Sequence, residues 1–358
     1  MRIGKVPENV LRRSVLRQIK TKDTEVEIGA GLGEDCAVFS YSGTGYLAVC
    51  MQEAVITADP DNPAGTTIAQ LIQRCANNLA AGRAELKAVL ISLILPVAAE
   101  ESELKYLMTE AEKKCASLSA EIAGGQTRTS SAVTEPVAVV TGYGRYLADR
   151  KQPEPICPNG EPEPNLPFSP GTVRSIGRAA PGQDIVLSKW IGLEGTALLA
   201  RRNREKLLAR YPAYLVEEAA GFDRYLSVVP EAAAAVKSGV CAMHDVSEGG
   251  IFGALRELAE KAGVGLTIDM KKLPLRQETV EICEFCRANP YELLSGGCLL
   301  MTTEDGSGLV AALAAKDIPA VIVGKVTESN DRILVNDDEI RYLDRAGQDA
   351  VYRLPDAD

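Results

Sequence analysis

Hydrophobic positions in the first 150 residues follow two different periodicities. Helical spacing, with apolar side chains three or four positions apart, is found at 7–19, 66–81 and 100–118. Runs rich in leucine and β-branched residues, which are typical of strands, are found at 36–40, 46–51, 88–95 and 137–146. Because helices and strands alternate along this part of the chain, we predict a mixed α/β domain.

The rest of the chain shows the same alternation after a proline-rich interruption. Residues 151–171 carry many prolines and almost no apolar periodicity, which is typical of a linker. Beyond it, helical spacing is found at 195–209, 231–238, 249–262 and 277–288, and strand-like runs at 184–187, 265–269, 298–302, 320–323 and 332–335. The predicted architecture is a two-domain α/β (α+β) fold, with domains at 1–150 and 172–358.

Charge and cysteine usage exclude several classes of protein. The 358 residues carry 39 Lys and Arg against 49 Asp and Glu, a formal net charge of −10. A general DNA or RNA binder needs a basic stripe, so we expect no nucleic acid partner. No apolar run approaches a membrane span of roughly 18–20 residues, and the start does not have the pattern of a secretory signal. Nine cysteines without a disulfide-protein spacing predict reduced thiols in a cytoplasmic protein.

Glycines stand beside carboxylates or amides in several short motifs that we interpret as turns. Backbone N–H groups of glycine turns approach anions closely, and carboxylates hold cations such as Mg²⁺. None of the motifs has the spacing of a P-loop or of a Rossmann phosphate loop, and each taken alone is better explained as a turn. They are Gly31–Asp35, Gln52-Glu53, Asn77-Asn78, Gly124–Thr127, Gly192–Thr196, His244–Gly250 and Ser295–Gly297.

A longer series of motifs extends over nearly the whole chain outside the linker. It comprises Gly4–Pro7, Gly33–Val38, Lys189–Thr196, Ser227–Pro230, Met243–Gly250, Asn289–Tyr291, Ser295–Gly297 and Val323–Thr327. In this order the series resembles the aminoimidazole-ribonucleotide-synthase (PurM-like) superfamily of ATP-binding proteins. That superfamily includes thiamine-monophosphate kinase, selenophosphate synthetase and the hydrogenase maturation factors, and the sequence looks most like the group similar to the last of these.

The resemblance implies a fold, a ligand and a set of site residues. It implies an N-terminal domain whose strands close a β-barrel with those of a second subunit, hence a homodimer, and a C-terminal α/β domain beside it. ATP with Mg²⁺ would lie in the cleft between the domains, and Gly249-Gly250 would start a helix whose N–H groups face phosphate. The implied metal ligands are Asp35, Glu53, Asn78 and Asp245, and the implied nucleotide contacts are Gly33, Gly124, Gly125, Thr127, Gly249, Gly250, Ser295, Gly296 and Gly297.

Three positions depart from the pattern of the superfamily. Glu53 stands where relatives have a shorter aspartate, Asn78 stands where they have a carboxylate, and Gln126 replaces a histidine. Asn78 still offers a carbonyl oxygen to Mg²⁺ but contributes no charge, so the predicted metal site is weakened. The maturation factor that forms a cyano ligand also uses a cysteine at its C-terminus, whereas the last cysteine here is Cys298. We therefore expect no cyano-forming activity.

His244 is the only histidine, and two interpretations of it are open. Together with Asp245 it could act as a general acid or base near neutral pH. Alternatively, its hydrogen bonds orient the turn between a strand and a helix. Asp35 also has two interpretations, since a carboxylate beside glycines either holds a metal ion or caps a turn.

The resemblance and the departures from it leave two functions from different classes open. In the first, the protein is a cytoplasmic, homodimeric enzyme that uses Mg-ATP to phosphorylate or activate an oxygen of a small-molecule or protein substrate. In the second, it is a nucleotide-binding or non-catalytic partner protein whose metal site is eroded at Glu53 and Asn78.

Overall fold

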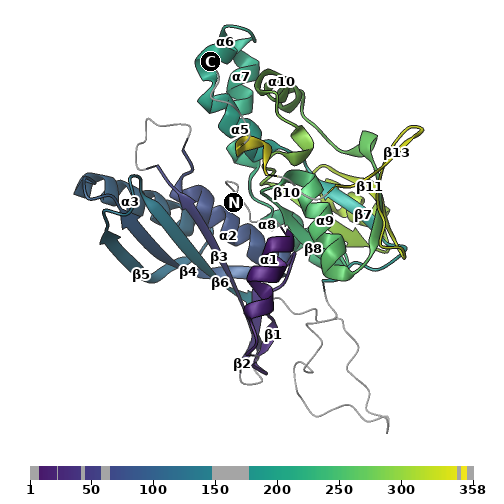
Figure 1. The fold of residues 1–358 in the computed structure, drawn as a ribbon, viewed down its shortest axis with the longest axis horizontal. Helices are drawn as coiled ribbons and strands as arrows, with labels where there is room; N and C mark the ends of the chain where they lie inside the picture. Colours follow the sequence, from purple (N-terminus) through teal and green to yellow (C-terminus); the bar gives the residue numbers. More distant parts are fainter. Residues whose placement is uncertain are drawn as a thin grey trace.

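The computed structural model describes residues 8–21, 23–41, 45–57, 65–146, 177–344 and 348–352. The predicted linker at 151–171 and the motif Gly4–Pro7 lie outside these ranges. The described residues form two mixed sheets, each with helices packed on it, and the two parts lie side by side (Figure 1). The predicted α/β (α+β) fold class, with two separate sheet-based parts, is confirmed.

The N-terminal part is built on a six-stranded sheet with the strand order β1-β2-β3-β6-β4-β5. Neighbouring strands are antiparallel, apart from the parallel pair β4 and β5. The strands are β1 Val26–Ile28, β2 Ala37–Tyr41, β3 Gly45–Val55, β4 Ala84–Leu95, β5 Glu121–Thr129 and β6 Val137–Tyr146. The helices are α1 Glu8–Ser14, α2 Ile68–Ala81 and α3 Glu101–Ser117, with α2 packed on the sheet and α3 packed on α2.

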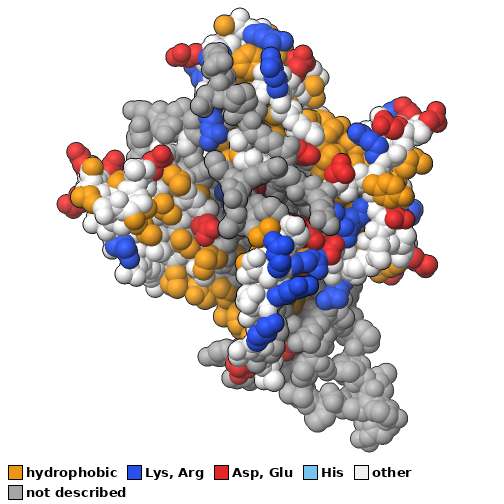
Figure 2. Space-filling model, viewed as in Figure 1, with side chains coloured by type: hydrophobic (Ala, Val, Ile, Leu, Met, Phe, Trp, Pro, Cys, Tyr) orange, Lys and Arg blue, Asp and Glu red, His pale blue; other side chains and the backbone are white. Residues whose placement is uncertain are grey.

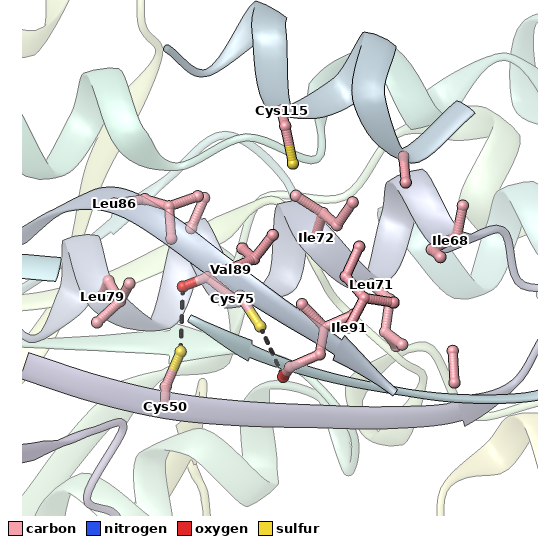
Figure 3. Close-up of a cluster of buried hydrophobic side chains, with 14 of the residues drawn as sticks. Cys50, Ile68, Leu71, Ile72, Cys75, Leu79, Leu86, Val89, Ile91 and Cys115 are labelled. Atoms are coloured by element: carbon pink, nitrogen blue, oxygen red, sulfur yellow. Dashed lines mark hydrogen bonds between the residues drawn. The ribbon is translucent and has the colours of Figure 1, made fainter. Parts of the chain in front are cut away.

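Helix α2 supplies much of the N-terminal core (Figure 3). A capping box fixes its start, because the Thr67 hydroxyl accepts the Gln70 backbone N–H and the Gln70 side chain accepts the Thr67 N–H. Two buried thiols bind the helix to the sheet: Cys50 Sγ donates to the Cys75 carbonyl and Cys75 Sγ donates to the Val140 carbonyl, both at 3.4 Å. Burial of the apolar face of α2, more than helix propensity, holds the helix in place.

The opposite face of this sheet is apolar and exposed. Side chains alternate along β3, so that Ala48 and Cys50 are buried beneath α2 whereas Leu47, Met51 and Val55 point outward. Met51 is 60% exposed and Val55 is 54% exposed. Figure 2 shows hydrophobic side chains gathered over this part of the molecule. An apolar patch of this kind is typical of a surface that contacts another protein.

Strand β5 overturns one interpretation of the sequence. The motif Gly124–Thr127 is not a turn, because it lies inside β5 and pairs with β4. A Cβ on Gly125 would overlap the carbonyl oxygen of Ile91 on β4. Close approach of the two strand backbones therefore accounts for this glycine.

Replacing Gly125 with alanine is expected to lower the free energy of unfolding by about 3 kcal/mol, because β4 and β5 must move apart to admit the methyl group. Urea unfolding followed by circular dichroism measures the loss. Gly124→Ala is the matched control: it has a similar backbone φ, but its Cβ would lie 3.5 Å from a Leu90 methyl group, an ordinary contact. Equal losses in the two variants would contradict the explanation from backbone approach.

The C-terminal part is built on a seven-stranded sheet with the strand order β13-β12-β9-β11-β7-β10-β8. Neighbouring strands are antiparallel, apart from the parallel pair β9 and β12. The strands are β7 Asp184–Ser188, β8 Ala242–Val246, β9 Gly265–Asp269, β10 Cys298–Thr303, β11 Ala320–Thr327, β12 Arg332–Asn336 and β13 Glu339–Tyr342. The helices are α5 Leu193–Arg202, α6 Arg204–Leu208, α7 Ala213–Ala220, α8 Val229–Lys237, α9 Gly250–Ala262, α10 Gln277–Cys286 and α11 Gly306–Ala314. Within the described ranges, no helix combines the length and apolar character needed to cross a bilayer.

Several elements differ from the sequence prediction. The apolar pattern does not predict β1, β5, β8, β13, α7 or α11, and the helix predicted at 195–209 is interrupted at Asn203 to give α5 and α6. The motifs around Glu53 and Asn78, also interpreted as turns, lie inside β3 and α2. His244 and Asp245 belong to β8, where both side chains are buried. Two polar residues in the middle of a short buried strand conceal its apolar character.

The two parts meet along α2, which packs against α8 and β8. The buried amide of Asn77 crosses this boundary: its nitrogen donates to the Leu226 carbonyl at 2.7 Å, and its oxygen accepts the Val228 N–H at 3.0 Å. Arg83, at the end of α2, donates to the carbonyl of Val240. These hydrogen bonds fix the segment before α8 and the start of β8 against the N-terminal part.

Candidate functional site

His244 lies on β8 between two carboxylates, at the boundary of the two parts. Its Nδ1 is 2.9 Å from Oδ2 of Asp35, which precedes β2, and its Nε2 is 3.1 Å from Oε2 of Glu257 on α9. The imidazole is 7% exposed and the Asp35 side chain is 8% exposed. Because ionised carboxylates only accept hydrogen bonds, both ring nitrogens donate and the ring is an imidazolium.

The charge of His244 follows from these neighbours. Burial lowers the pKa of the imidazole, but the charges and hydrogen bonds of Asp35 and Glu257 raise it by more. The resulting pKa is about 10. A ring with this pKa keeps its proton at neutral pH, and both of its nitrogens are already engaged. The arrangement favours a structural role through hydrogen bonds, although these bonds hold Asp35 and Glu257 and not the turn between β8 and α9. A role of His244 as a catalytic acid or base stays a prediction.

Asp245 is the next residue on β8, and its carboxylate is buried beside those of Asp35 and Glu194. The residue is 3% exposed, and its Oδ1 is buried without a partner among the described residues. Burial, together with the nearby carboxylates of Asp35 and Glu194, raises the pKa of Asp245 well above its usual value, although His244 opposes the shift. A buried carboxylate oxygen without a partner is a position that a cation would satisfy.

Three of the four predicted metal ligands come together in this region. Asn78 on α2 donates to the backbone oxygen of Asp35 at 3.4 Å, and Asp35 lies near enough to Asp245 to raise its pKa. Glu53 does not join them, because it is exposed on the outer face of the N-terminal sheet. Among the described residues, no group of three or more His, Cys, Asp or Glu side chains could by itself hold a metal ion. A cation here would take further ligands from a bound molecule or from water.

Gly124, Gly125 and Thr127 lie apart from this region. They belong to β5, which is four strands away from β2 in the sheet, or about 19 Å at the usual spacing of strands. The structure does not bring them to Asp35 or His244 within one chain. Their contact with a nucleotide stays a prediction.

Three of the other predicted nucleotide contacts lie at α9, with Gly33 against its side and Gly249 and Gly250 at its start. Gly33 packs against the side of this helix, where a Cβ would lie 2.6 Å from the carbonyl oxygen of Glu257. Gly249 precedes α9 and Gly250 begins it. Gly250 has a φ of 64°, and a Cβ there would lie 2.5 Å from the carbonyl oxygen of Tyr291, so no other residue fits this turn without strain.

The segment Ser295–Gly297 lies beside the starts of α5 and α9. The Ser295 hydroxyl accepts the Gly192 N–H and donates to the Leu293 carbonyl, both at 2.7 Å, and the Ser295 N–H donates to the Ser247 carbonyl at 3.2 Å. The serine side chain is therefore engaged within the protein, and only backbone groups of this segment remain as candidate ligand contacts. Contact with a nucleotide stays a prediction for all three residues.

Sequence reasoning did not find the buried ion pairs that surround the site. Arg74 on α2 contacts Glu194 on α5, with Nη2 2.6 Å from Oε1. Lys189, after β7, contacts Glu231 on α8, with Nζ 2.6 Å from Oε1. The only local signal is that Lys189 is a charged residue directly after the buried strand β7. No local pattern pairs Arg74 with a residue 120 positions away.

Comparison with sequences of known proteins gives matches on both parts. The N-terminal domain of AIR synthase related proteins matches residues 33–146, and the C-terminal domain of the same proteins matches residues 180–336. Carbamoyl dehydratase HypE of Rhodobacter capsulatus is 30% identical over 160 residues, which is 44% of this chain and 45% of that protein. A putative hydrogenase expression/formation protein of Methanocaldococcus jannaschii is 23% identical over 342 residues, which is 93% of this chain and 91% of that protein.

A solved structure shares the fold over nearly the whole chain. The crystal structure of hydrogenase maturation protein HypE in complex with ATP superposes with a TM-score of 0.66 at 18% identity, covering 98% of this chain and 97% of that one. The two domain matches together span more than half of this chain, one on each sheet. The chain therefore belongs to the AIR synthase related protein family.

Proposed function

We propose that this protein binds Mg-ATP at the boundary of its two parts and uses it to phosphorylate or activate an oxygen of a small-molecule or protein substrate. The observation that carries the proposal is the buried Oδ1 of Asp245, which has no hydrogen-bond partner within the described ranges and lies close to the carboxylate of Asp35. A related protein of the same fold has been crystallised with ATP, which supports nucleotide binding in this family.

The residues present fit a partly hydrated Mg²⁺ better than an ion enclosed by protein. Mg²⁺ commonly takes one or two carboxylates and completes its shell with phosphate oxygens and water. Asp35 and Asp245 would hold it, and it would offset the negative charge of the phosphate groups. The backbone N–H groups at the start of α9 would face a phosphate, because helix N-termini favour anions.

We also propose that two copies associate through the outer face of the N-terminal sheet. The exposed Met51 and Val55, and the position of β5 as an edge strand of the sheet in the described part of the chain, support this arrangement. A second copy would cover this apolar face and remove an unpaired sheet edge. In such a dimer, Glu53 and the β5 glycines would belong to the interface.

A non-catalytic function is the second candidate, and two observations favour it. Glu53 is exposed on the outer face of the sheet, and the one described hydrogen bond of the neutral Asn78 side chain goes to the backbone oxygen of Asp35. A site with fewer charges would bind nucleotide and metal weakly. Calorimetric titration with ATP, with and without Mg²⁺, separates the candidates when it is followed by an assay for released ADP. Metal-dependent binding with ADP release would exclude the second candidate, and no binding at millimolar ATP would exclude the first.

Replacing Asp245 with asparagine is expected to weaken Mg-ATP binding about tenfold or more, because the variant loses a charge that would hold the cation. The affinity for ATP without Mg²⁺ should not fall, because the variant removes a negative charge beside the phosphate groups. Burial raises the pKa of Asp245, so at a pH above the usual carboxyl pKa the ionised side chain is less favourable in the folded protein than in the unfolded chain. The neutral variant is therefore expected to lose no thermal stability at pH 7.5.

Asp337→Asn serves as the control for this experiment, because Asp337 is an exposed carboxylate after β12 whose partner is Lys271. Calorimetric titration compares the two variants with the natural protein. The same Mg-ATP affinity in Asp245→Asn as in the control would contradict the metal role of Asp245.

A further inference from the structure

The last described residues, 348–352, are docked on the C-terminal part. Residues Ala350–Tyr352 form a short 3-10 turn beside α5, where Figure 1 shows it in yellow. Ala350 and Val351 are buried in an apolar cluster that includes Leu199 of α5 and Leu293. This contact places the preceding residue, Asp349, at the start of α9.

The Asp349 carboxylate is buried and accepts three backbone N–H groups. Its Oδ2 accepts the N–H of Gly249 at 2.7 Å, and its Oδ1 accepts the N–H of Leu294 at 3.2 Å and that of Val351 at 2.9 Å. The residue is 2% exposed. Gly249 caps α9, and Leu294 directly precedes Ser295. The carboxylate therefore bridges the start of α9 and the residue before Ser295, and the resemblance implies nucleotide contacts at Gly249-Gly250 and at Ser295–Gly297.

A carboxylate and a phosphate group compete for the same kind of partner. Both present anionic oxygens that accept backbone N–H groups, and the N-terminus of a 13-residue helix favours either. Burial, with a smaller contribution from Glu248, raises the pKa of Asp349 to about 6 even though the three N–H groups lower it. Lost hydration therefore weakens the hold of this carboxylate on the three N–H groups, which reduces the free energy that a competing anion must supply to displace it.

We propose that Asp349 is a built-in competitor of the nucleotide: its carboxylate occupies the N–H groups of Gly249 and Leu294 that would bind a phosphate group of ATP. Nucleotide binding then requires release of the segment 348–352. The inference rests on the proposed function for the identity of the anion. The contact lowers the apparent affinity for ATP, because ATP must first displace a segment of the same chain, which is present at a high local concentration.

Calorimetric titration of the full-length protein with Mg-ATP tests the proposal, with adenosine as a second ligand. If the segment occupies the site most of the time, Asp349→Ala is expected to bind Mg-ATP about tenfold more tightly than the natural protein. Adenosine has no phosphate, so its affinity should be the same in both. Asp344→Ala is the matched control, because Asp344 is an exposed carboxylate a few residues earlier and should leave both affinities unchanged. Asp349→Asn removes the charge but keeps the shape, and it replaces the alanine variant if that variant does not fold.

Hydrogen exchange on the natural protein gives a test that needs no substitution. Mg-ATP is expected to speed exchange of the amides in a peptide covering 348–352, and adenosine is expected not to. If the natural protein binds Mg-ATP while that peptide stays protected and the Asp349 variants bind no more tightly, the inference is overturned and the proposed function stands. If neither the natural protein nor any variant binds ATP, the proposed function fails and the inference fails with it.

Discussion

Replacing His244 with alanine is expected to lower the free energy of unfolding by about 3–5 kcal/mol at pH 7.5, the usual cost of removing one partner of a buried ion pair. The imidazolium is the cation between Asp35 and Glu257, at 2.9 and 3.1 Å, and Asp245 lies close by. Without it, the carboxylates of these residues repel one another in a buried environment. Urea unfolding measures the loss.

The double variant His244→Ala, Glu257→Gln is the control for this explanation. Removing a second charge should relieve part of the repulsion, so the double variant is expected to be more stable than the sum of the two single losses. A loss below about 1 kcal/mol in His244→Ala would contradict the role of the ring as a buried cation. Strict additivity would show instead that His244 acts by packing alone.

The second large effect is expected at Lys189. Its Nζ donates to the carbonyls of Tyr225 and Ser227, at 2.7 and 2.5 Å, and contacts Glu231 Oε1 at 2.6 Å. Lys189→Met would leave the Glu231 side chain without its cation and 2% exposed, and its Oε2 already lacks a hydrogen-bond partner among the described residues. The expected loss in the free energy of unfolding is about 3–5 kcal/mol, again measured by urea unfolding.

The double variant Lys189→Met, Glu231→Gln shows whether charge is the cause. Replacing both members of a buried pair by neutral side chains of similar size is often close to neutral, so this variant should regain most of the lost stability. If it is as unstable as Lys189→Met, the two carbonyl contacts rather than the ion pair account for the loss. That outcome would locate the effect in the segment before α8, which Asn77 holds against the N-terminal part.

The elements with strong periodicity could be predicted from the sequence. Helix α2 and strand β6 are found where the apolar spacing places them. Each buries its apolar positions along nearly its whole length, so the pattern in the sequence is uninterrupted. Strand β5 could not be predicted, because its glycine pair indicates a turn and most of its residues are exposed. Its existence depends on pairing with β4, which local sequence does not encode.

The candidate site could be predicted only in part. The motifs of the superfamily identify Asp35 and the pair His244-Asp245, which the structure brings together. Glu257 and Asp349 could not be found, because a glutamate on an amphipathic helix and an aspartate near the end of a chain are ordinary surface residues by sequence. Their function is set by partners in space: Asp349 contacts a residue 100 positions away in the sequence.

The buried thiols allow the opening of each half of the molecule to be timed separately. In the N-terminal part, Cys36 and Cys115 are buried, and burial raises the pKa of their thiols to about 12 and about 11. Cys298 in the C-terminal sheet is likewise buried, with a pKa raised by burial. Alkylating reagents attack the thiolate, so each of these cysteines reacts only when the part around it unfolds. Their labelling rates in one sample therefore distinguish a molecule that opens one half at a time from one whose halves open together.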